Sequence, residues 1–413
     1  MLEALWANCD GLADELATLY RDFHQHPELS LQEFRTAAKI ADVLRRSGFE
    51  VDTEIGGTGV VGVLRNGEGP VVMLRADIDA LPVWEQTGLP YASTVRAVDA
   101  TGRDVPVMHA CGHDMHAVCL LGAATLLARA RGEWSGTVLL VFQPAEELVR
   151  GARDMVRDGL FERFPRPEII LAQHVGPLPA GVIGHRGGPV MSGADSLQVT
   201  LFGRGGHGAR PDTTIDPVLM AAHIVTRLQA IVAREVPPGE TAVVTVGRLQ
   251  AGTVDNIIPD TAELGINLRA NTERTRALVR AAVERIIRAE ALAAGAEREP
   301  ALEWSASTPI LVSDEVATAR TVAAFTEHFG ADRIVPVPPV TASEDVGILG
   351  EAAAAPTVYW FWGGMDLAGR GLSPDRAPTN HSAEFALDIE PTLTTGVEAL
   401  VVAGLTWLAK PNL

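Results

Sequence analysis

The sequence predicts a two-domain α/β protein, in which a large α/β sandwich with a largely parallel sheet carries a smaller inserted domain. The chain has 413 residues, more than one hydrophobic core usually organises, so two structural units are expected. Short β-branched runs alternate with helical patterns in both outer parts of the chain, as in α/β sandwiches. The middle part has its own order of elements, which indicates a second domain.

The first part of the chain begins with two helical patterns. A helix is expected over about Leu2–His24, a turn at Pro27, and a second helix over Leu31–Arg46 that stops before Gly48. A further helix is expected over His116–Arg129. Four β-branched runs predict strands, at Val60–Leu64, Val71–Leu74, Thr137–Phe142 and Ile169–Ala172.

The middle of the chain predicts a ferredoxin-like domain. Its expected elements are strand Ser196–Phe202, helix Asp216–Arg234, strands Ala242–Leu249 and Thr261–Leu268, helix Arg274–Leu292 and strand Leu302–Trp304. This βαββαβ order is the split ferredoxin-like motif. After Pro309 the first rhythm resumes with helix Asp314–Phe329, strand Thr357–Phe361 and helix Pro391–Leu408. We therefore expect a discontinuous domain, 1–191 and 309–413, and an inserted domain, 192–308.

Composition limits the classes of partner and compartment. A net charge of -18 and a pI near 5.0 argue against binding nucleic acid or an anionic membrane. Leu2–Leu19 carries dispersed charges unlike a signal peptide, and no later segment is long and uncharged enough to span a bilayer. Three cysteines, Cys9, Cys111 and Cys119, cannot form a disulfide framework. A soluble cytoplasmic protein with a small-molecule substrate is expected.

The run from His109 to His116, with the sequence HACGHDMH, predicts a metal-binding loop. It gathers three histidines, Cys111 and an aspartate around Gly112. Cys111 and His113, two positions apart in extended backbone, would point to the same side, and the glycine lets both reach one ion. The helix expected after the loop would place Cys111 near a helix N-terminus, where the dipole favours the thiolate. Every histidine of the run is a candidate ligand at this point.

Three further polar motifs each follow an expected strand. They are Arg75-Ala76-Asp77-Ile78-Asp79, Gln143-Pro144-Ala145-Glu146-Glu147 and Gln173-His174. Sites in open α/β sheets form at the carboxyl ends of the strands, so these motifs should line one crevice with the cysteine loop.

Glu146 and Glu147 are informative as a pair. On near-extended backbone, one can ligate a metal while the other faces the water that the metal activates and takes its proton. The competing interpretation is a pair of solvated acids that start a loop. For His174 a satisfied core histidine, and for His381 a solvent-exposed loop residue, are the alternatives that the residues alone leave open.

Together these motifs resemble the dinuclear metal amidohydrolases, a family that includes hippurate hydrolases, N-acyl-amino-acid hydrolases (aminoacylases) and indole-acetyl-amino-acid hydrolases. The resemblance runs nearly end to end, from the segment FHQHPE at 23–28 to the loop that contains His381. The segments 234–236 and 242–247 are especially similar to bacterial enzymes that cleave N-acylglutamine. The resemblance implies a zinc-peptidase-like sandwich whose inserted domain acts as a lid and dimerisation domain in a homodimer.

The resemblance also assigns roles. It implies that two divalent metal ions, with zinc favoured and manganese or cobalt as alternatives, are held by Cys111, His113, Glu147, His174 and His381, with Cys111 shared between the ions. Glu146 would be the general base. Asp79 would orient a ligand, Asp114 would have a supporting role, and the role of Asp77 stays open.

The inserted domain is expected to contribute to the same reaction. His207 lies in the glycine-rich run Gly203-Arg204-Gly205-Gly206-His207-Gly208, which presents it with little steric cover. In the family the matching histidine reaches the active site of the other subunit and helps hold the oxyanion. Asn256 and Arg269 would contact substrate, the arginine being suited to a free α-carboxylate. A surface arginine at a strand end is the equal alternative for Arg269.

The expected function is therefore metal-dependent hydrolysis of N-acyl amino acids, possibly including N-acylglutamine, to a carboxylic acid and a free amino acid. A dipeptidase or aminopeptidase of the same fold is one alternative, which would require recognition of a free amine. A non-catalytic metal-binding protein is another, and the intact Glu146 argues against it.

Overall fold

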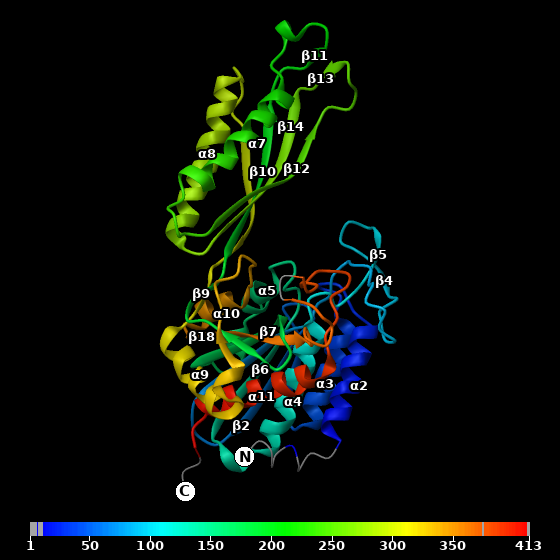
Figure 1. The fold of residues 1–413 in the computed structure, drawn as a ribbon, viewed down its shortest axis with the longest axis vertical. Helices are drawn as coiled ribbons and strands as arrows, with labels where there is room; N and C mark the ends of the chain where they lie inside the picture. The colour runs from blue at the N-terminus through cyan, green and yellow to red at the C-terminus, as the bar shows by residue number, and fades with distance from the viewer. Residues whose placement is uncertain (1–5, 7–10, 374–375, 411–413) are drawn as a thin grey trace. The chain divides into compact units, whose positions relative to one another are not determined.

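The computed structural model describes residue 6, residues 11–373 and residues 376–410 (Figure 1). The chain divides into two compact units: unit 1 is Met1–Gly188, Val312–Pro338 and Asp345–Leu413, and unit 2 is Pro189–Leu311 and Pro339–Glu344. The later segment of unit 2 was not in the predicted inserted domain. It belongs there because Arg269 donates through Nη1 to Thr341 O at 2.9 Å, and Val340 N donates to Val190 O at 2.8 Å.

Unit 1 is built on one eight-stranded sheet. In spatial order its strands are β1 (Glu50–Ile55), β2 (Gly59–Asn66), β6 (Gly136–Gln143), β3 (Val71–Asp77), β7 (Ile169–Pro179), β18 (Thr357–Met365), β8 (Ile183–His185) and β17 (Ile334–Pro336). The four central strands run parallel to one another. β1 and β2 pair antiparallel, β2 is antiparallel to β6, and β8 is antiparallel to β18. The sheet is thus mixed, with a parallel centre. A short hairpin turn joins only the antiparallel pair β1 and β2, whereas β2 and β6, and β8 and β18, are far apart in the sequence.

Helices cover both faces of this sheet. They are α2 (Leu12–Gln25), α3 (Phe34–Arg46), α4 (His113–Arg129), α5 (Gly151–Arg157), α6 (Leu160–Arg163), α9 (Glu315–Phe329), α10 (Val346–Ala353) and α11 (Ile389–Trp407). Gly62 of β2 faces Leu44 of α3, whereas Gly59 faces Met155 of α5, so these two helices lie on opposite faces. Leu2–Leu5, the expected start of the first helix, and Cys9 lie outside the described residues.

Helix α4 is buried along nearly its whole length. It packs against α2, α11 and strand β3, and its apolar side chains belong to the main core cluster. Cys119 lies inside this core and its thiol contacts Leu393 O at 3.7 Å. A helix so embedded holds its N-terminal residues rigidly against the strand ends, which is where the predicted metal loop lies.

Unit 2 has the predicted ferredoxin-like arrangement. Its antiparallel sheet has the order β12 (Ala242–Ala251), β14 (Thr261–Ala270), β10 (Gly193–Phe202) and β15 (Ala301–Thr308), with helices α7 (Pro217–Arg234) and α8 (Glu273–Ala293). Asp216 and Thr272 cap the two helices, each accepting a backbone N–H of the first turn. A small ribbon, β11 (Gly206–His207) with β13 (Ile257–Ile258), completes this unit.

The remaining elements are short. They are the hairpin β4 (Arg96–Val98) and β5 (Asp104–Pro106), strands β9 (Gly188–Met191) and β16 (Leu311–Ser313), and the 3-10 turns Arg131–Glu133, Pro211–Thr213 and Ala331–Arg333. Among the residues described, no helix combines the length and the apolar character that crossing a membrane requires.

Candidate active site

The cysteine loop enters helix α4 through a left-handed glycine. Gly112 has φ 82° and precedes His113, the first residue of the helix. The expected extended backbone, and a helix starting at His116, are therefore wrong: the helix begins earlier because Gly112 reverses the chain directly. A Cβ atom at Gly112 would lie 2.4 Å from Val175 Cγ1, so a larger residue is excluded by space as well as by φ. Cys111 consequently sits just before the N-terminus of the helix.

The ring of His113 is oriented by the end of strand β3. Its Nδ1–H donates to Asp79 O at 2.9 Å and lies 3.3 Å from Asp79 Oδ1. The other nitrogen, Nε2, is buried and makes no hydrogen bond among the described residues. A histidine whose first nitrogen is fixed by a protein acceptor, and whose second nitrogen is bare, is set up as a metal ligand.

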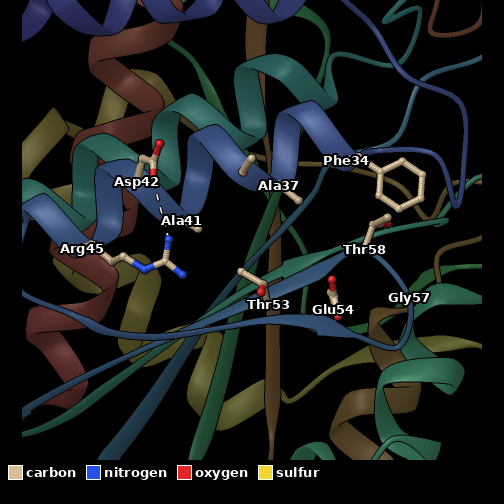
Figure 2. A pocket seen from close by; sticks show the side chains of 10 residues that line it. Phe34, Ala37, Ala41, Asp42, Arg45, Thr53, Glu54, Gly57 and Thr58 are labelled. Atoms are coloured by element: carbon tan, nitrogen blue, oxygen red, sulfur yellow. Dashed lines mark ion pairs between the residues drawn. The ribbon is translucent and has the colours of Figure 1, made fainter.

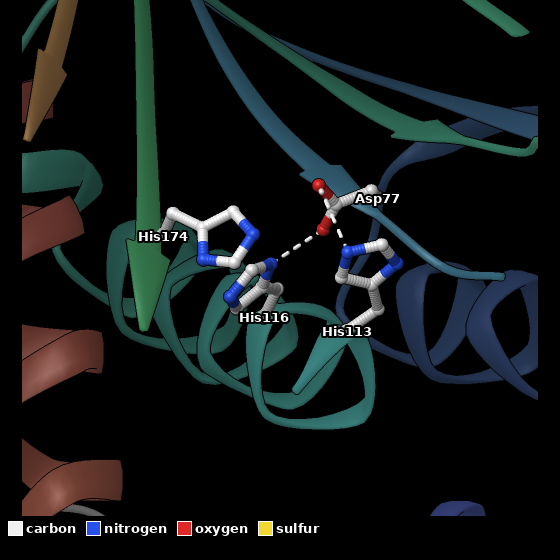
Figure 3. A group of neighbouring side chains, drawn as sticks. All are labelled: Asp77, His113, His116 and His174. Carbon is white, nitrogen blue, oxygen red and sulfur yellow. Dashed lines mark hydrogen bonds and ion pairs between the residues drawn. The ribbon is translucent and has the colours of Figure 1, made fainter. Parts of the chain in front are cut away.

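His174 lies inside β7, because that strand continues beyond its expected end at Ala172. Its Nδ1–H donates to Val175 O at 2.8 Å, and Nε2 lies 3.5 Å from Cys111 Sγ. Both nitrogens of His116 are occupied, by Asp77 Oδ1 at 2.5 Å and by Val175 N at 2.9 Å. Figure 3 shows His116 between Asp77 and His174. His116 thus uses both ring nitrogens for hydrogen bonds to the protein and has a supporting role in the site.

Asp77, whose role the sequence left open, belongs to a buried polar network. Its carboxylate accepts from Arg75 Nη1 at 2.8 Å as well as from His116. Arg75 also bonds Gln143 Oε1 and Asp345 Oδ1, and all of these side chains are buried. The network locks the ends of β3 and β6 together.

Glu146 and Glu147 lie in a tight turn after β6, so the expected near-extended backbone is wrong. Val149 N donates to Glu146 O at 2.6 Å, and Ala145 takes the left-handed conformation with φ 49°. The N–H groups of both glutamates donate to the carboxylate of Asp79, at 3.1 and 3.0 Å. One aspartate thereby holds the glutamate turn and contacts the His113 ring.

The carboxyl groups of this turn reach towards the histidine of the cysteine loop. Glu146 Oε2 lies 4.0 Å and Glu147 Oε1 lies 3.9 Å from His113 Nε2. Both glutamates are at least nine-tenths buried at their side chains. His381 closes the group from the C-terminal part of the chain, with Nε2 3.2 Å from Glu147 Oε1.

His381 has φ 71°, and its backbone N–H donates to Ala110 O at 2.7 Å. Asn380, which the sequence analysis did not single out, donates through Nδ2 to Cys111 O and to Val175 O, each at 3.2 Å. Asn380 therefore connects the three segments that carry the predicted ligands Cys111, His174 and His381. Its position beside His381 was the only signal in the sequence.

The electrostatics of the group favour a bound cation. Burial alone would raise the pKa of the Cys111 thiol, but His174 and His113 outweigh it and hold that pKa well below its usual value. The Cys111 thiolate and the Glu147 carboxylate raise the pKa of His381 to about 10. Burial and the Cys111 charge raise the pKa of Glu147 to about 7. The raised pKa values of Glu147 and His381 favour protons on these two groups, beside the Cys111 thiolate. A divalent ion bound by the three groups would displace those protons.

The donor atoms also have suitable spacing. One ligand atom each of Cys111, His113 and Glu147 lies within 4.8 Å of the others. Donors at about 2.0–2.3 Å from a tetrahedral zinc ion lie about 3.3–3.8 Å apart, and His113 Nε2 and Glu147 Oε1 lie 3.9 Å apart. A mixed sulfur, nitrogen and oxygen set that includes a bare buried nitrogen fits divalent metal ions.

Asp114 and His109, the other two candidates of the cysteine loop, have surroundings that differ from those of the donor group. Asp114 Oδ2 pairs with His24 Nδ1 at 2.7 Å, and His24 Nε2 lies 3.1 Å from Glu85 Oε1, all three being buried. Against the effect of burial, the two carboxylates raise the pKa of His24 to about 10. Burial lowers the pKa of His109 to about 4. Asp114 therefore anchors helix α2 to the start of α4 through His24.

The other predicted site residues belong to unit 2. His207 is exposed in β11, and Ala209 N donates to its Nδ1 at 3.0 Å. Gly208 N donates to Asn256 O at 2.8 Å, so His207 and Asn256 lie in the same ribbon. Arg269 is half-buried, and its guanidinium bonds Asn267 Oδ1, Thr341 O and Ser343 Oγ.

Comparison with known proteins gives a consistent picture. The family model described as peptidase family M20/M25/M40 matches residues 73–402. N-acetylcysteine deacetylase of Bacillus subtilis is 40% identical over 302 residues, which are 72% of this chain and 76% of that protein. Hippurate hydrolase of Campylobacter jejuni is 37% identical over 343 residues, 82% of this chain and 86% of that protein.

Among solved structures, a dinuclear metal-binding peptidase of family M20 from Bacillus subtilis superposes with a TM-score of 0.78 and 31% identity, covering 96% of this chain and 99% of its own. This likeness confirms the predicted two-domain zinc-peptidase-like fold. The chain therefore belongs to peptidase family M20/M25/M40 and is a metal-dependent amidohydrolase of that family.

Proposed function

We propose that the enzyme hydrolyses the amide bond of N-acyl amino acids, releasing a carboxylic acid and a free amino acid, with N-acylglutamine as one candidate substrate. The observation that carries the proposal is a buried glutamate, Glu146, within 4.0 Å of a bare histidine nitrogen in a thiolate, imidazole and carboxylate donor set. The names of the deacetylase and hippurate hydrolase relatives support the substrate class.

The residues proposed to hold two divalent ions are Cys111, His113, Glu147, His174 and His381. When bound, the ions polarise the amide carbonyl and lower the pKa of water. Thiolate and imidazole donors favour zinc, whereas the carboxylate also admits manganese or cobalt. The orientation of two of the three histidine rings comes from hydrogen bonds to this chain: Asp79 O fixes His113, and Val175 O fixes His174.

Glu146 is proposed to move the proton of the reaction. Its carboxylate takes a proton from the water whose oxygen bonds to the amide carbon. The carboxyl group then donates that proton to the amide nitrogen as the carbon–nitrogen bond breaks, so that the amine leaves neutral. Asp79 accepts the backbone N–H of Glu146 at 3.1 Å, which fixes the segment that carries the proposed base.

His207 of the partner subunit is proposed to donate a hydrogen bond to the oxyanion. Ala209 N–H occupies Nδ1, so the neutral ring carries its proton on Nε2, the atom that faces away from the backbone. This role requires a homodimer formed through the inserted domain. Asn256 shares the ribbon of His207 and is proposed to contact substrate. Arg269 is proposed to bind the α-carboxylate, although its Nη1 bonds the 339–344 segment.

The first experiment compares wild type with Glu146→Gln on the N-acetyl and N-benzoyl forms of one amino acid and on a dipeptide with a free amine that ends in the same amino acid. Metal content is measured on the same samples. We expect amino-acid release only from acylated substrates, and a kcat at least about 100-fold lower in the variant with unchanged metal content. Near-normal turnover by Glu146→Gln would contradict the mechanism. Preference for the free amine would replace the aminoacylase by a dipeptidase or aminopeptidase.

The second experiment tests the subunit exchange of His207. Homodimers of Glu146→Gln and homodimers of His207→Ala should both have low activity. Mixed dimers contain one site with an intact Glu146 and an intact His207 of the partner subunit, so co-refolded mixtures should recover activity. No recovery in mixtures whose heterodimer content is verified would contradict the assignment of His207.

A further inference from the structure

Glu33 is a buried carboxylate that the proposed mechanism does not use. It occupies the N-cap position of α3, yet its side chain makes no capping bond to that helix. Glu28 does so instead, since its carboxylate accepts the N–H groups of Arg35 and Thr36 at 3.0 and 2.8 Å. The Glu33 side chain is therefore free of the task that its position usually has.

The two oxygens of Glu33 have other partners. Oε1 accepts the backbone N–H of Ala145 at 2.9 Å, and Oε2 accepts the hydroxyl of Thr58 at 2.5 Å. Figure 2 shows Thr58 beside Phe34, in the wall of a pocket between α3 and the β1–β2 loop. Glu33 thus connects the glutamate turn to a different layer of unit 1.

Three consecutive backbone N–H groups of this turn donate hydrogen bonds to two buried carboxylates. Ala145 N donates to Glu33, and the next two N–H groups donate to Asp79. Asp79 is itself held by Ser30 Oγ at 2.6 Å, from the same loop that leads to Glu33. The turn also contains the left-handed Ala145, which needs such fixation to persist.

Keeping Glu33 in this place is unfavourable in isolation. Its residue is 0% exposed, and burial followed by the nearby charge of Asp79 raises its pKa to about 7. A buried carboxyl group beside another carboxylate is retained only when its hydrogen bonds matter. The helix does not need it, because Glu28 caps α3.

We propose that Glu33 is a positioning residue that, together with Asp79, fixes the turn carrying the base Glu146 and the ligand Glu147. The proposal rests on the proposed function only for its kinetic consequence. Its structural consequence, a rigid Ala145 amide, holds whatever the substrate is.

The test uses Glu33→Met, which keeps the side-chain length but removes both acceptors, and Glu33→Gln, whose amide oxygen can still accept from Ala145. The matched control is Glu28→Met, which removes two acceptors at the same helix end without touching the turn. We expect Glu33→Met to lower kcat by about 10–100-fold with KM nearly constant, and Glu33→Gln to restore most of it.

Amide hydrogen exchange provides the readout that does not depend on activity. Exchange at residues 145–147 should accelerate at least about tenfold in Glu33→Met and remain unchanged in Glu28→Met. An equal loss of kcat in Glu33→Met and Glu28→Met would overturn the proposal. Unchanged amide exchange at residues 145–147 in Glu33→Met would also overturn it. If Glu33→Met does not fold, the wild-type Ala145 amide decides, because it should exchange as slowly as those of β6, and fast exchange refutes the role.

The two proposals fail separately. If the wild-type enzyme releases no amino acid from any acylated substrate, the proposed function is wrong, while the exchange measurements still decide the role of Glu33. If hydrolysis is normal but amide exchange at residues 145–147 is the same in wild type and Glu33→Met, only the positioning role of Glu33 is refuted.

Discussion

Replacing His24 by leucine should strongly destabilise unit 1. The imidazole lies between Asp114 and Glu85, at 2.7 and 3.1 Å, and all three side chains are at most 2% exposed. Leucine fills similar volume but leaves two carboxylates buried without a cation, a situation that costs about 3–5 kcal/mol. The pKa of about 10, against an ordinary 6.5, gives a similar figure of about 5 kcal/mol.

The pH dependence follows from the direction of that pKa. Because folding raises the pKa of His24, its stabilisation is fully present below about pH 6.5 and is lost as the pH rises through about 10. The lowered pKa values of Glu85 and Asp114 keep their contributions present above the usual carboxyl range. The stability gap between wild type and His24→Leu should therefore be largest near pH 6 and shrink towards pH 10.

Equilibrium urea unfolding at pH 6, 8 and 10 measures this gap. The control is His26→Leu, a half-exposed histidine next to the same helix, which should change stability by less than about 0.5 kcal/mol. Adding Glu85→Gln to His24→Leu should recover part of the loss, because it removes one unpaired charge. A loss below about 1 kcal/mol, or a gap that does not narrow at high pH, would refute the reasoning.

Three further predictions concern the metal centre. Asp79→Asn replaces one acceptor oxygen by a donor, so a metal titration should show affinity lowered by about 10–100-fold, and unchanged affinity would contradict its orienting role. Cys111→Ser should purify with less metal than Cys119→Ser, as measured by elemental analysis, since only the first would lose a proposed thiolate ligand; equal contents would argue against Cys111. Gly151→Ala would place a Cβ 1.6 Å from Pro144 O, so kcat should fall at least about tenfold through displacement of the turn, whereas wild-type kinetics would show that the turn tolerates movement.

The long, strongly patterned elements could be predicted from the sequence, and the short ones could not. α7 and α8 have continuous periodic faces and capping residues, so they were placed within a few residues of their observed ends. β1, with mostly exposed side chains, has no apolar pattern that separates it from a loop. β8 and β17, at only three residues each, depend on a neighbouring strand for their existence.

The site was predictable in its residue types but not in its backbone. The parallel pairing of β3 with β6 and β7 brings the ends of β3 and β6 close to the middle of β7. The structure places Asp79 against Glu146, and His174 within one group of donor atoms with Asp77 and His113. The turn at Glu146 and the helix start at His113 depend on single left-handed residues, Ala145 and Gly112. Such conformations are selected by tertiary hydrogen bonds, which a linear pattern does not contain.

Asn380 and Glu33 illustrate the same limit. Each binds backbone groups far away in the chain, at Cys111 and Ala145. A side chain that recognises a peptide group leaves no mark on the sequence of its partner, so neither contact could be inferred from residue types.

The proposed ligand residues are held in place by hydrogen bonds to the protein itself. Asp79 O directs His113, Val175 O directs His174, and Ala110 O holds the backbone of His381. Removal of bound ions with a chelator should therefore leave a folded apoenzyme whose donor atoms keep their positions. We expect such a protein to regain activity when a divalent ion is added back, because the proposed donor side chains need little rearrangement.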